Sequence, residues 1–201
     1  MAFENGSTVN WAKIGEWEGN RLRGYVPENA YGSVLGVSGV TIGMGVDLGQ
    51  MDPSALDALD ITPSLKETLS PYLGLKGDAA LEALQAPLTI TQNESDHLNA
   101  AVQAAKVDLV RQRYDAAVGS DGARFDDLPE AAQTVITSVA FQWGSIWARS
   151  SPPDIPMFWQ AVISRDWEKT ISVLRGWALK PWHGAIYRTR RNAEADYLAS
   201  A

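Results

Sequence analysis

Residues 39–49 of the chain read GVTIGMGVDLG, a run in which four glycines are interspersed with branched and aliphatic side chains. Short β-branched pieces punctuated by glycine are typical of strands joined by tight turns. The upstream pieces GYVP and SVLGV have the same character. Residues 24–49 are therefore predicted to form a hairpin or a small three-stranded antiparallel sheet. Two polar residues, Thr41 and Asp47, stand at the two ends of its tightest glycine ladder.

The length and composition of the chain predict one folded domain. The chain has 201 residues, of which 45% are hydrophobic and 20% charged, so it can bury a sizeable core and is not expected to be disordered. We expect a single catalytic domain over residues 1–201, with a sheet lobe at about 20–90 and a helical lobe at about 91–201 plus the N-terminal helix. No apolar run approaches the ~20 residues of a membrane span, and the start MAFENGSTVNWAKIG does not resemble a signal peptide.

The scarcity of cysteine and histidine directs attention to the carboxylates. The chain has no cysteine, which excludes disulfides, thiolate nucleophiles and zinc sites of the cysteine type. Two histidines are too few for a histidine-rich metal centre. We therefore expect no metal and no cofactor, and carboxylates as the working groups of an enzyme.

The charge of the chain is acidic overall and unevenly distributed. The net charge is −7, which argues against a general nucleic-acid binder. From residue 162 to the end the net charge is +3, which leaves −10 for the first 161 residues. A basic end segment suits contact with an anionic surface or polymer, and a solvated helix face would have the same composition.

The rest of the chain has helical patterns. A first helix is expected to follow Ser7 or Thr8 as its cap and to stop at Gly19, which puts Glu18 in its last turn. Thr91 and Glu94 form a capping box, and the helix that follows is predicted over residues 92–118, roughly 40 Å long. Further helices are predicted in PSALDALD, PSLKETLSPYLG, LPEAAQTVITSVAFQWGSIW, IPMFWQAVISRD, DWEKTISVLRGWA and GAIYRTRRNAEADYLASA, with ARSSPPDIP as a loop. The predicted fold class is mainly helical α+β.

Three residues have the chemistry that glycosidic bond cleavage requires. One carboxylic acid protonates the leaving oxygen, and a second polar or acidic group positions water or stabilises positive charge on the sugar. Glu18, beside Trp17, is the candidate acid, while Asp47 and Thr41 are candidates for the second role. Each also has an ordinary structural interpretation: a solvated helix end, an acceptor for turn amides, and a β-forming residue.

The sheet segment resembles that of phage-type lysozymes, the muramidases that cut bacterial cell walls. VTIGMGVDLG is similar to their threonine-isoleucine-glycine-x-glycine strand, and EGNRLRGY fits the segment in which a catalytic glutamate ends the first helix. The order glutamate, threonine, aspartate is closer still to the pesticin-like branch, which contains bacterial-toxin and phage muramidases. The resemblance implies a two-lobed lysozyme-like fold, with Glu18, Thr41 and Asp47 as the catalytic residues.

Two later segments resemble the same family. VAFQWG is similar to its second-lobe helix motif, which implies that Gln142 binds substrate, and YRTRRNAEADYL is similar to its closing helix. The resemblance implies that one arginine of that helix orients Glu18; the three candidates are Arg188, Arg190 and Arg191. Glycines let a substrate approach the backbone closely, and aromatic rings can stack on sugars. The further candidates for substrate binding are Gly43, Gly45, Trp17, Tyr25 and Tyr31.

The chain departs from the commonest phage pattern in its second carboxylate. Val46 stands where a histidine often follows the glycine ladder, and AYGSVLGVSGV, just before Thr41, contains no aspartate. This favours Asp47 as the second carboxylate over the substitutes Glu28 and Asp52. Inversion, with water held by Thr41 or Asp47, is the preferred course. Retention depends on the separation of the carboxyl groups, which the sequence does not give.

The expected substrate is bacterial peptidoglycan, cut between N-acetylmuramic acid and N-acetylglucosamine. We expect a monomer that binds no nucleic acid, does not insert stably in a membrane and acts as a phage endolysin. It would be made in the host cytoplasm and act in the periplasm or at the wall, with a holin opening the membrane. The start at Met1 without a receptor or translocation segment favours this setting. The alternatives are a bacteriocin or secreted effector, a lytic transglycosylase, and a non-catalytic wall-binding module.

Overall fold

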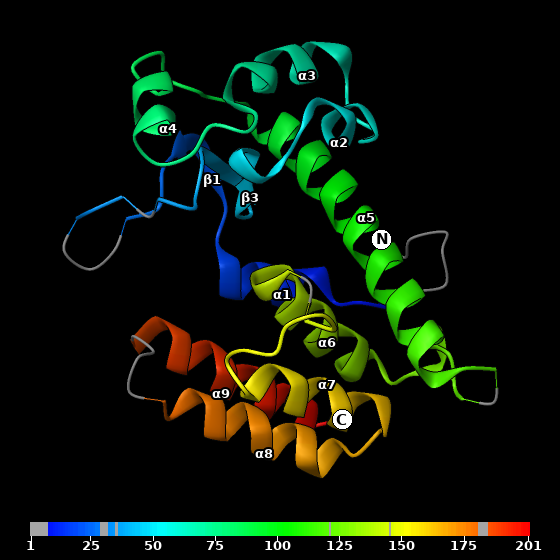
Figure 1. Ribbon diagram of the computed structural model, residues 1–201. Coiled ribbons are helices and arrows are strands. Elements are labelled where there is room, and N and C mark those ends of the chain that lie inside the picture. The colour runs from blue at the N-terminus through cyan, green and yellow to red at the C-terminus, as the bar shows by residue number, and fades with distance from the viewer. Residues whose placement is uncertain (1–7, 29–31, 35, 121, 145, 181–184) are drawn as a thin grey trace. The chain divides into compact units, whose positions relative to one another are not determined.

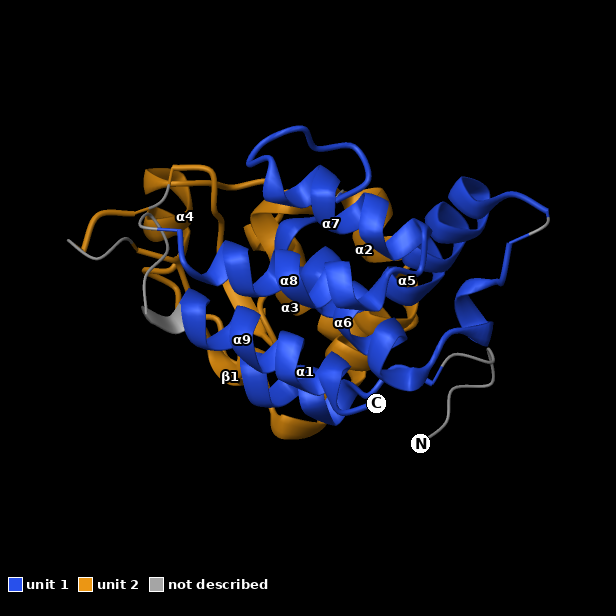
Figure 2. Ribbon diagram, turned by 90° about the horizontal axis from the view of Figure 1, so that it is seen from below, with its two compact units in different colours: residues 1–17, 106–201 blue, residues 18–105 orange. Residues whose placement is uncertain are grey.

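The structure is a computed structural model that describes residues 8–28, 32–34, 36–120, 122–144, 146–180 and 185–201. The chain divides into two compact units, coloured separately in Figure 2. Unit 1 consists of Met1–Trp17 and Lys106–Ala201, and unit 2 of Glu18–Ala105. Residues 91–105, expected in the helical lobe, thus group with the sheet. The assignment of residues 1–201 to a single catalytic domain stays a prediction.

Unit 2 contains the small sheet that the glycine-rich segment predicts. Strands β1 (Arg21–Tyr25), β2 (Thr41–Gly43) and β3 (Val46–Asp47) pair antiparallel in the order β1-β2-β3. The other edge of β1 is not open, because the Gly24 amide donates to the Leu88 carbonyl and the Ile90 amide to the Leu22 carbonyl. The prediction of a mainly helical α+β chain with a small antiparallel sheet is confirmed.

Short helices follow the sheet in unit 2. They are η1 (Leu48–Gln50), α2 (Pro53–Asp57), α3 (Pro63–Leu69), η2 (Ser70–Tyr72) and α4 (Asp78–Ala83) (Figure 1). Asp52, a substitute for the second carboxylate, caps α2: its carboxylate accepts from the Ala55 amide at 2.8 Å and from the Ser54 hydroxyl at 2.6 Å. Glu28, the other substitute, is exposed and forms an isolated bridge with Val34. Neither residue lies in a strand of the sheet.

The long helix α5 (Gln92–Val118) has the bounds predicted from its sequence. Its capping box is also confirmed: the Thr91 amide donates to the Glu94 carboxylate at 2.8 Å, and the Glu94 amide donates to the Thr91 hydroxyl at 3.2 Å. Residues 92–105 of α5 belong to unit 2 and residues 106–118 to unit 1. Among the described residues, no helix is both long enough and apolar enough to cross a bilayer.

Unit 1 is made of helices. They are α1 (Trp11–Glu18, whose last residue belongs to unit 2), η3 (Phe125–Asp127), α6 (Glu130–Trp143), α7 (Asp154–Ile163), α8 (Trp167–Ala178) and α9 (Ala185–Ala199). Helix α8 packs against both α7 and α9, as Figure 1 shows. The cap expected for α1 was wrong: Asn10 accepts from the Lys13 amide at 3.0 Å, whereas the Thr8 amide donates to Gln133. Ser7 lies outside the described residues.

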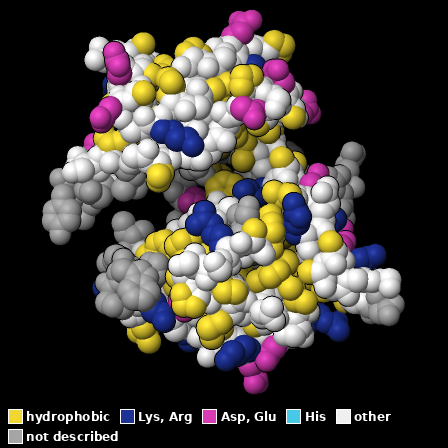
Figure 3. Space-filling view, in the orientation of Figure 1, with side chains coloured by type: hydrophobic (Ala, Val, Ile, Leu, Met, Phe, Trp, Pro, Cys, Tyr) yellow, Lys and Arg dark blue, Asp and Glu magenta, His cyan; other side chains and the backbone are white. Residues whose placement is uncertain are grey.

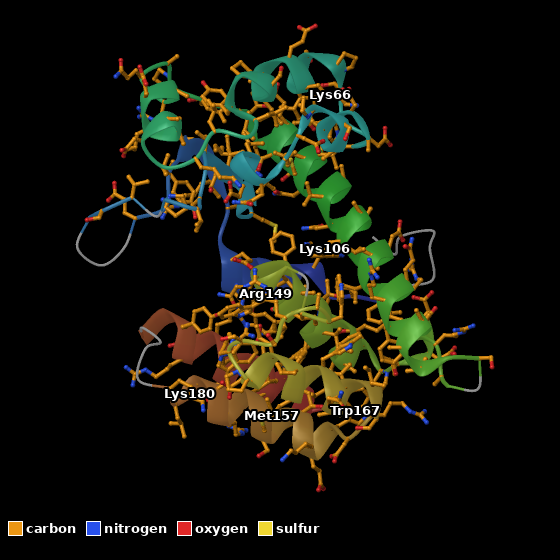
Figure 4. All side chains as sticks on the ribbon, viewed as in Figure 1. Lys66, Lys106, Arg149, Met157, Trp167 and Lys180 are labelled. Atoms are coloured by element: carbon orange, nitrogen blue, oxygen red, sulfur yellow. The ribbon has the colours of Figure 1, made fainter. Side chains whose placement is uncertain are left out.

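The tryptophans of unit 1 mainly form its core. Trp159 and Trp177 are buried, and Trp143, Trp147 and Trp167 pack half-buried against the same cluster. Cations cover two of these rings: the guanidinium carbon of Arg149 lies 5.8 Å from the centre of the Trp143 ring, and that of Arg113 lies 5.7 Å from that of Trp147. Arg149 and Trp167 are labelled in Figure 4. These five tryptophans therefore pack in the core of unit 1.

The uneven charge of the sequence is visible on the surface. On the face shown in Figure 3, Asp and Glu side chains are spread over the helices of unit 2, while Lys and Arg side chains are prominent over unit 1. The cations of unit 1 include Lys106 on α5, whose ammonium lies 5.8 Å from the centre of the Phe141 ring (Figure 4). Burial lowers the pKa of the Lys106 ammonium.

Candidate active site

Thr41 and Asp47 lie side by side in the sheet. Their Cα atoms are direct partners in the β2–β3 ladder, so both side chains project to the same face. Tyr25 of β1 is the partner of Thr41 on its other side, which makes a row of Tyr25, Thr41 and Asp47 across three strands. Thr41 is buried, with 4% of its surface exposed, and its hydroxyl donates to the Gly39 carbonyl at 3.2 Å.

The Asp47 carboxylate is held by backbone amides. Its Oδ1 accepts from the Gly39 amide at 3.0 Å and from the Gly49 amide at 2.9 Å, and it caps the short helix η1. Among the described residues, Oδ2 accepts no hydrogen bond, and the side chain is half-buried. Asp47 does bond turn amides, as its ordinary structural interpretation requires, and it retains one oxygen for a ligand.

The two glycines that hold Asp47 are required by close packing. A Cβ added at Gly39 would lie 2.4 Å from the Gly49 Cα and 2.4 Å from the Leu75 carbonyl oxygen. A Cβ at Gly49 would lie 2.5 Å from that same oxygen. Any larger residue at either position would push these backbone segments apart and move the amides away from Asp47. The glycine spacing of the sequence thus fixes the direction of the carboxylate.

Glu18 is the last residue of α1 and ends it as predicted. Gly19 follows with φ 73°, the left-handed conformation with which helices commonly terminate. The Glu18 side chain is half-buried. Trp17, a candidate for stacking on sugar, instead packs edge-on against Tyr197 in unit 1, with ring centres 6.1 Å apart. Tyr31 lies outside the described residues.

The pKa of the Tyr25 hydroxyl responds to the charges of both carboxylates, Glu18 and Asp47. Burial raises its pKa above the ordinary value; the positive charge of Arg21 opposes this rise, and the negative charges of Glu18 and Asp47 add to it. Because charges act on a titrating group only over short distances, both carboxylates lie near this hydroxyl. The Arg21 guanidinium carbon lies 4.2 Å from the centre of the Tyr25 ring. Glu18, Tyr25, Thr41 and Asp47 therefore share one region of unit 2.

Gly43 and Gly45 form the turn between β2 and β3. Their φ angles are 62° and 80°, which other residues rarely adopt. A Cβ at Gly43 would lie 2.6 Å from Oδ1 of Asn99 on α5, so this glycine also makes room for a neighbouring side chain. The turn thus has a structural reason for both glycines, and their contact with substrate stays a prediction.

Three of the residues predicted in unit 1 form a buried cluster. Arg191 donates to Gln142 at 2.8 Å and to the Glu194 carboxylate at 2.6 Å. Arg190 donates to the same Glu194 oxygen at 3.2 Å. Arg190 and Arg191 are buried, whereas Arg188 is exposed on α9. The pairing of an arginine with Glu18 stays a prediction, as does contact of Gln142 with substrate.

Two hollows of the surface lie away from the predicted residues. One, of about 500 Å³, lies beside α2 and α3 in unit 2; the other, of about 380 Å³, lies beside η3 and the start of α8 in unit 1. Of the residues considered for the site, only the substitute Asp52 lines one of them, the hollow in unit 2. The sequence interpretation also missed Asn20, Ser95 and Asn99, which bond to one another behind the sheet turn. The sequence signal for Ser95 and Asn99 was their spacing: two polar residues four apart lie on the same face of a helix, and such residues need hydrogen-bond partners when that face is buried.

The comparison with protein families identifies the family of the chain. Residues 9–168 match the family model described as Pesticin, bacterial toxin homologue of phage lysozyme, C-terminal part. The matched range includes Glu18, Tyr25, Thr41 and Asp47, and it ends before the arginines of α9. None of the curated proteins searched matches the chain. Since the match covers most of the sequence, the chain belongs to the pesticin family of phage-lysozyme homologues, a family of muramidase glycoside hydrolases.

Proposed function

We propose that this chain hydrolyses bacterial peptidoglycan at the β-1,4 bond between N-acetylmuramic acid and N-acetylglucosamine. The observation that carries the proposal is the row of Tyr25, Thr41 and Asp47 across the sheet, with the charges of Glu18 and Asp47 both raising the pKa of Tyr25. Two carboxylates around one polar, half-buried region are what glycosidic bond cleavage requires. Membership of a muramidase family supports the choice of bond.

Glu18 is proposed as the general acid that protonates the glycosidic oxygen. Glu18 ends α1, and the left-handed Gly19 that follows lets the chain turn sharply into β1. The last residue of β1 is Tyr25, whose pKa is raised by the charge of Glu18. As the bond breaks, the sugar develops oxocarbenium character. Asp47 is proposed to stabilise that positive charge through Oδ2, since Oδ1 is already used by two amides.

Thr41 and Asp47 are proposed to orient the attacking water. The Thr41 hydroxyl donates its only hydrogen to the Gly39 carbonyl, so toward a water it can act only as an acceptor. Asp47 Oδ2 is likewise an acceptor. Two acceptors engage both hydrogens of one water and leave its lone pair for the anomeric carbon. As the new carbon–oxygen bond forms, the proton that faces Asp47 passes to Oδ2, while Glu18 has given its own proton to the leaving oxygen. This arrangement supports inversion, which NMR of the first-formed product anomer would test.

The remaining predicted residues are proposed for binding and orientation. Tyr25 would stack on a sugar ring through the face that Arg21 leaves open, and the Gly43–Gly45 turn and Gln142 would contact the glycan. An arginine of α9 is proposed to orient Glu18.

The direct test of the acid is Glu18→Gln, followed by clearing of a peptidoglycan suspension. We expect activity to be lost, because glutamine cannot donate a proton to the leaving oxygen. The matched control is Glu16→Gln on the same helix, an exposed glutamate that pairs with Lys13, and it should keep full activity. Undiminished clearing by Glu18→Gln would overturn the assignment of Glu18.

The products distinguish hydrolysis from its alternatives. A hydrolase releases reducing ends with no anhydro sugar, whereas a lytic transglycosylase, which needs only one glutamate, leaves an anhydro end. Mass spectrometry of the released fragments separates the two. Binding to cell walls without any release of fragments would instead indicate a wall-binding module. Thr41 and Asp47, the two groups that can hold water, favour hydrolysis.

For the biological role we propose a phage endolysin, with a bacteriocin or effector as the alternative. A net charge of −7 is unfavourable for an enzyme that meets an anionic envelope from outside and less so for one released within. Expression in the bacterial cytoplasm should therefore cause lysis only when a holin is co-expressed. Lysis of intact cells by the added protein alone would favour the bacteriocin.

A further inference from the structure

We propose that Asn99, with Ser95, is a positioning residue that sets the distance between the proposed acid and the Thr41–Asp47 pair. The inference rests on the proposed function for its catalytic consequence. It starts from a polar network inside unit 2 that links two segments far apart in the sequence. One segment follows Glu18, and the other is the turn between Thr41 and Asp47.

The first link holds the segment that follows Glu18. Asn20 comes two residues after Glu18, beyond the left-handed Gly19. Its side-chain oxygen accepts from the Ser95 hydroxyl at 2.9 Å and from the Asn99 amide nitrogen at 3.4 Å. The backbone leaving the proposed acid is thus attached to α5 by two hydrogen bonds.

The second link holds the turn of the sheet. The Asn99 oxygen accepts from the Met44 backbone amide at 2.9 Å, and Gly43 leaves the space in which this oxygen lies. One turn further along α5, the Gln103 amide nitrogen lies 3.3 Å from the Met44 sulfur. Because Met44 is at the centre of the turn that joins β2 to β3, Asn99 fixes the position of both strands.

The part of the network on α5 is buried, whereas Asn20 is exposed. Ser95 is fully buried and Asn99 is 7% exposed. The Asn99 nitrogen also donates to the Ser95 hydroxyl at 3.4 Å, so this amide bonds to Asn20, to Ser95 and to Met44. Removing one partner would leave buried polar groups without hydrogen bonds, and these would reorganise rather than stay in place.

The helix that bears the network is a rigid support. Ser95, Asn99 and Gln103 recur every four residues on one face of α5, which has 27 residues. A single helix face therefore holds both the segment after Glu18 and the turn between Thr41 and Asp47. Since catalytic groups displaced by about 1 Å can lose about a hundredfold in rate, this support would act on kcat rather than on substrate binding.

The test compares Asn99→Ala with the core truncation Leu65→Ala, which lies in α3 and outside the network. We expect Asn99→Ala to lower kcat about tenfold or more while KM changes less than threefold. Leu65→Ala should lose stability but keep kcat in conditions where it is folded. A wild-type kcat for folded Asn99→Ala would overturn the inference.

Asn99→Asp gives a second readout that a merely structural role would not produce. A protonated aspartic acid can still donate to Asn20 while its other oxygen accepts from Met44, whereas the carboxylate cannot donate. The ratio of variant to wild-type kcat should therefore rise as the pH falls. A ratio that does not change with pH would count against the role of Asn99.

The network and the proposed function fail in different ways. A double-mutant cycle of Asn20→Ala and Asn99→Ala, measured by urea unfolding, tests their coupling without any activity assay. Additive losses of stability would remove the physical basis of the inference. If Glu18→Gln abolished activity while folded Asn99→Ala kept wild-type kcat, the proposed function would stand and the positioning role would not.

Discussion

Two polar clusters that the sequence predicted for one active site differ in how their groups are satisfied. In unit 2, Asp47 is bonded on one oxygen by the backbone amides of two glycines. In unit 1, one oxygen of the buried Glu194 accepts from Arg190, Arg191 and the Ser138 hydroxyl. The first carboxylate is half-buried and the second is completely enclosed.

On the proposed function, the difference separates a binding group from a packing group. A carboxylate held on one side by fixed amides keeps its direction and offers its other oxygen to a ligand. A carboxylate surrounded by guanidiniums inside a core joins helices, here α9 through its own arginines and α6 through Ser138. The comparison therefore predicts that mutations of Glu194 act mainly on stability and mutations around Asp47 mainly on catalysis.

The largest effect is expected at the enclosed carboxylate. Glu194→Gln should lower the free energy of unfolding by about 3–5 kcal/mol, because two buried guanidiniums lose the charge that balances them. Asp196→Asn is the matched control on the same helix; its exposed pair with Arg175 should contribute less than about 1 kcal/mol. Urea unfolding of both variants measures the difference. Equal losses would show that the Glu194 cluster is not a structural centre.

The next effect is expected at the open carboxylate. Asp47→Asn should lower kcat at least about a hundredfold, or about 2.7 kcal/mol of barrier, because the amide cannot stabilise positive charge on the sugar. Its stability should change little, since the amide oxygen can still accept from the Gly39 and Gly49 amides. The control is Asp52→Ala, which removes the cap of α2 and should lower stability with kcat unchanged. Loss of kcat in Asp52→Ala instead would make Asp52 the second carboxylate.

A smaller effect is expected at the connection between β2 and β3. Gly43→Ala and Gly74→Ala both place a side chain at positive φ, at an intrinsic cost of about 1–2 kcal/mol each. Only at Gly43 does the new Cβ meet another group, the Asn99 oxygen, whereas at Gly74 the space is open. Gly43→Ala should therefore be less stable than Gly74→Ala in thermal unfolding, and should also lose kcat. Equal stability would mean that Asn99 can move aside at little cost.

The sequence predicted the elements better than it predicted their contacts. Local signals placed the ends of α1 and α5 well, because a left-handed glycine and a capping box act within four residues. The cap of α1 was misplaced because several cap-type residues precede that helix, and the one chosen depends on contacts with the distant Gln133 and Thr134. The pairing of Thr41 with Asp47 follows from the turn length alone.

The polar contacts of the site could be predicted less well. The link between Asn20 and Asn99 joins residues 79 apart in sequence, and no local pattern identifies such a pair. The closing helix shows the same limit. A role of its arginines beside Glu18 stays a prediction, whereas the enclosure of Glu194 between Arg190 and Arg191 is a property of the packed core. Sequence motifs thus located candidate residues, and packing decided which partners they have.

The smallest effect measures the grouping of the site directly, through the pKa of Tyr25. Because this pKa is raised in the folded chain, the stability contributed by the neutral phenol is present below the unfolded pKa of about 10 and is lost as the pH rises through the folded value. Glu18→Gln and Asp47→Asn each remove a negative charge and should lower the Tyr25 pKa, whereas Arg21→Gln removes a positive charge and should raise it. Tyrosine-specific NMR titration, assigned with Tyr25→Phe, measures these shifts.

Tyr197 is the internal control: its pKa is raised by burial and by Glu130 and Glu16, so Glu18→Gln should leave it unchanged. If neither carboxylate variant moved the Tyr25 pKa, the two carboxylates would not share one site, and the separation of a catalytic cluster from a packing cluster would lose its basis.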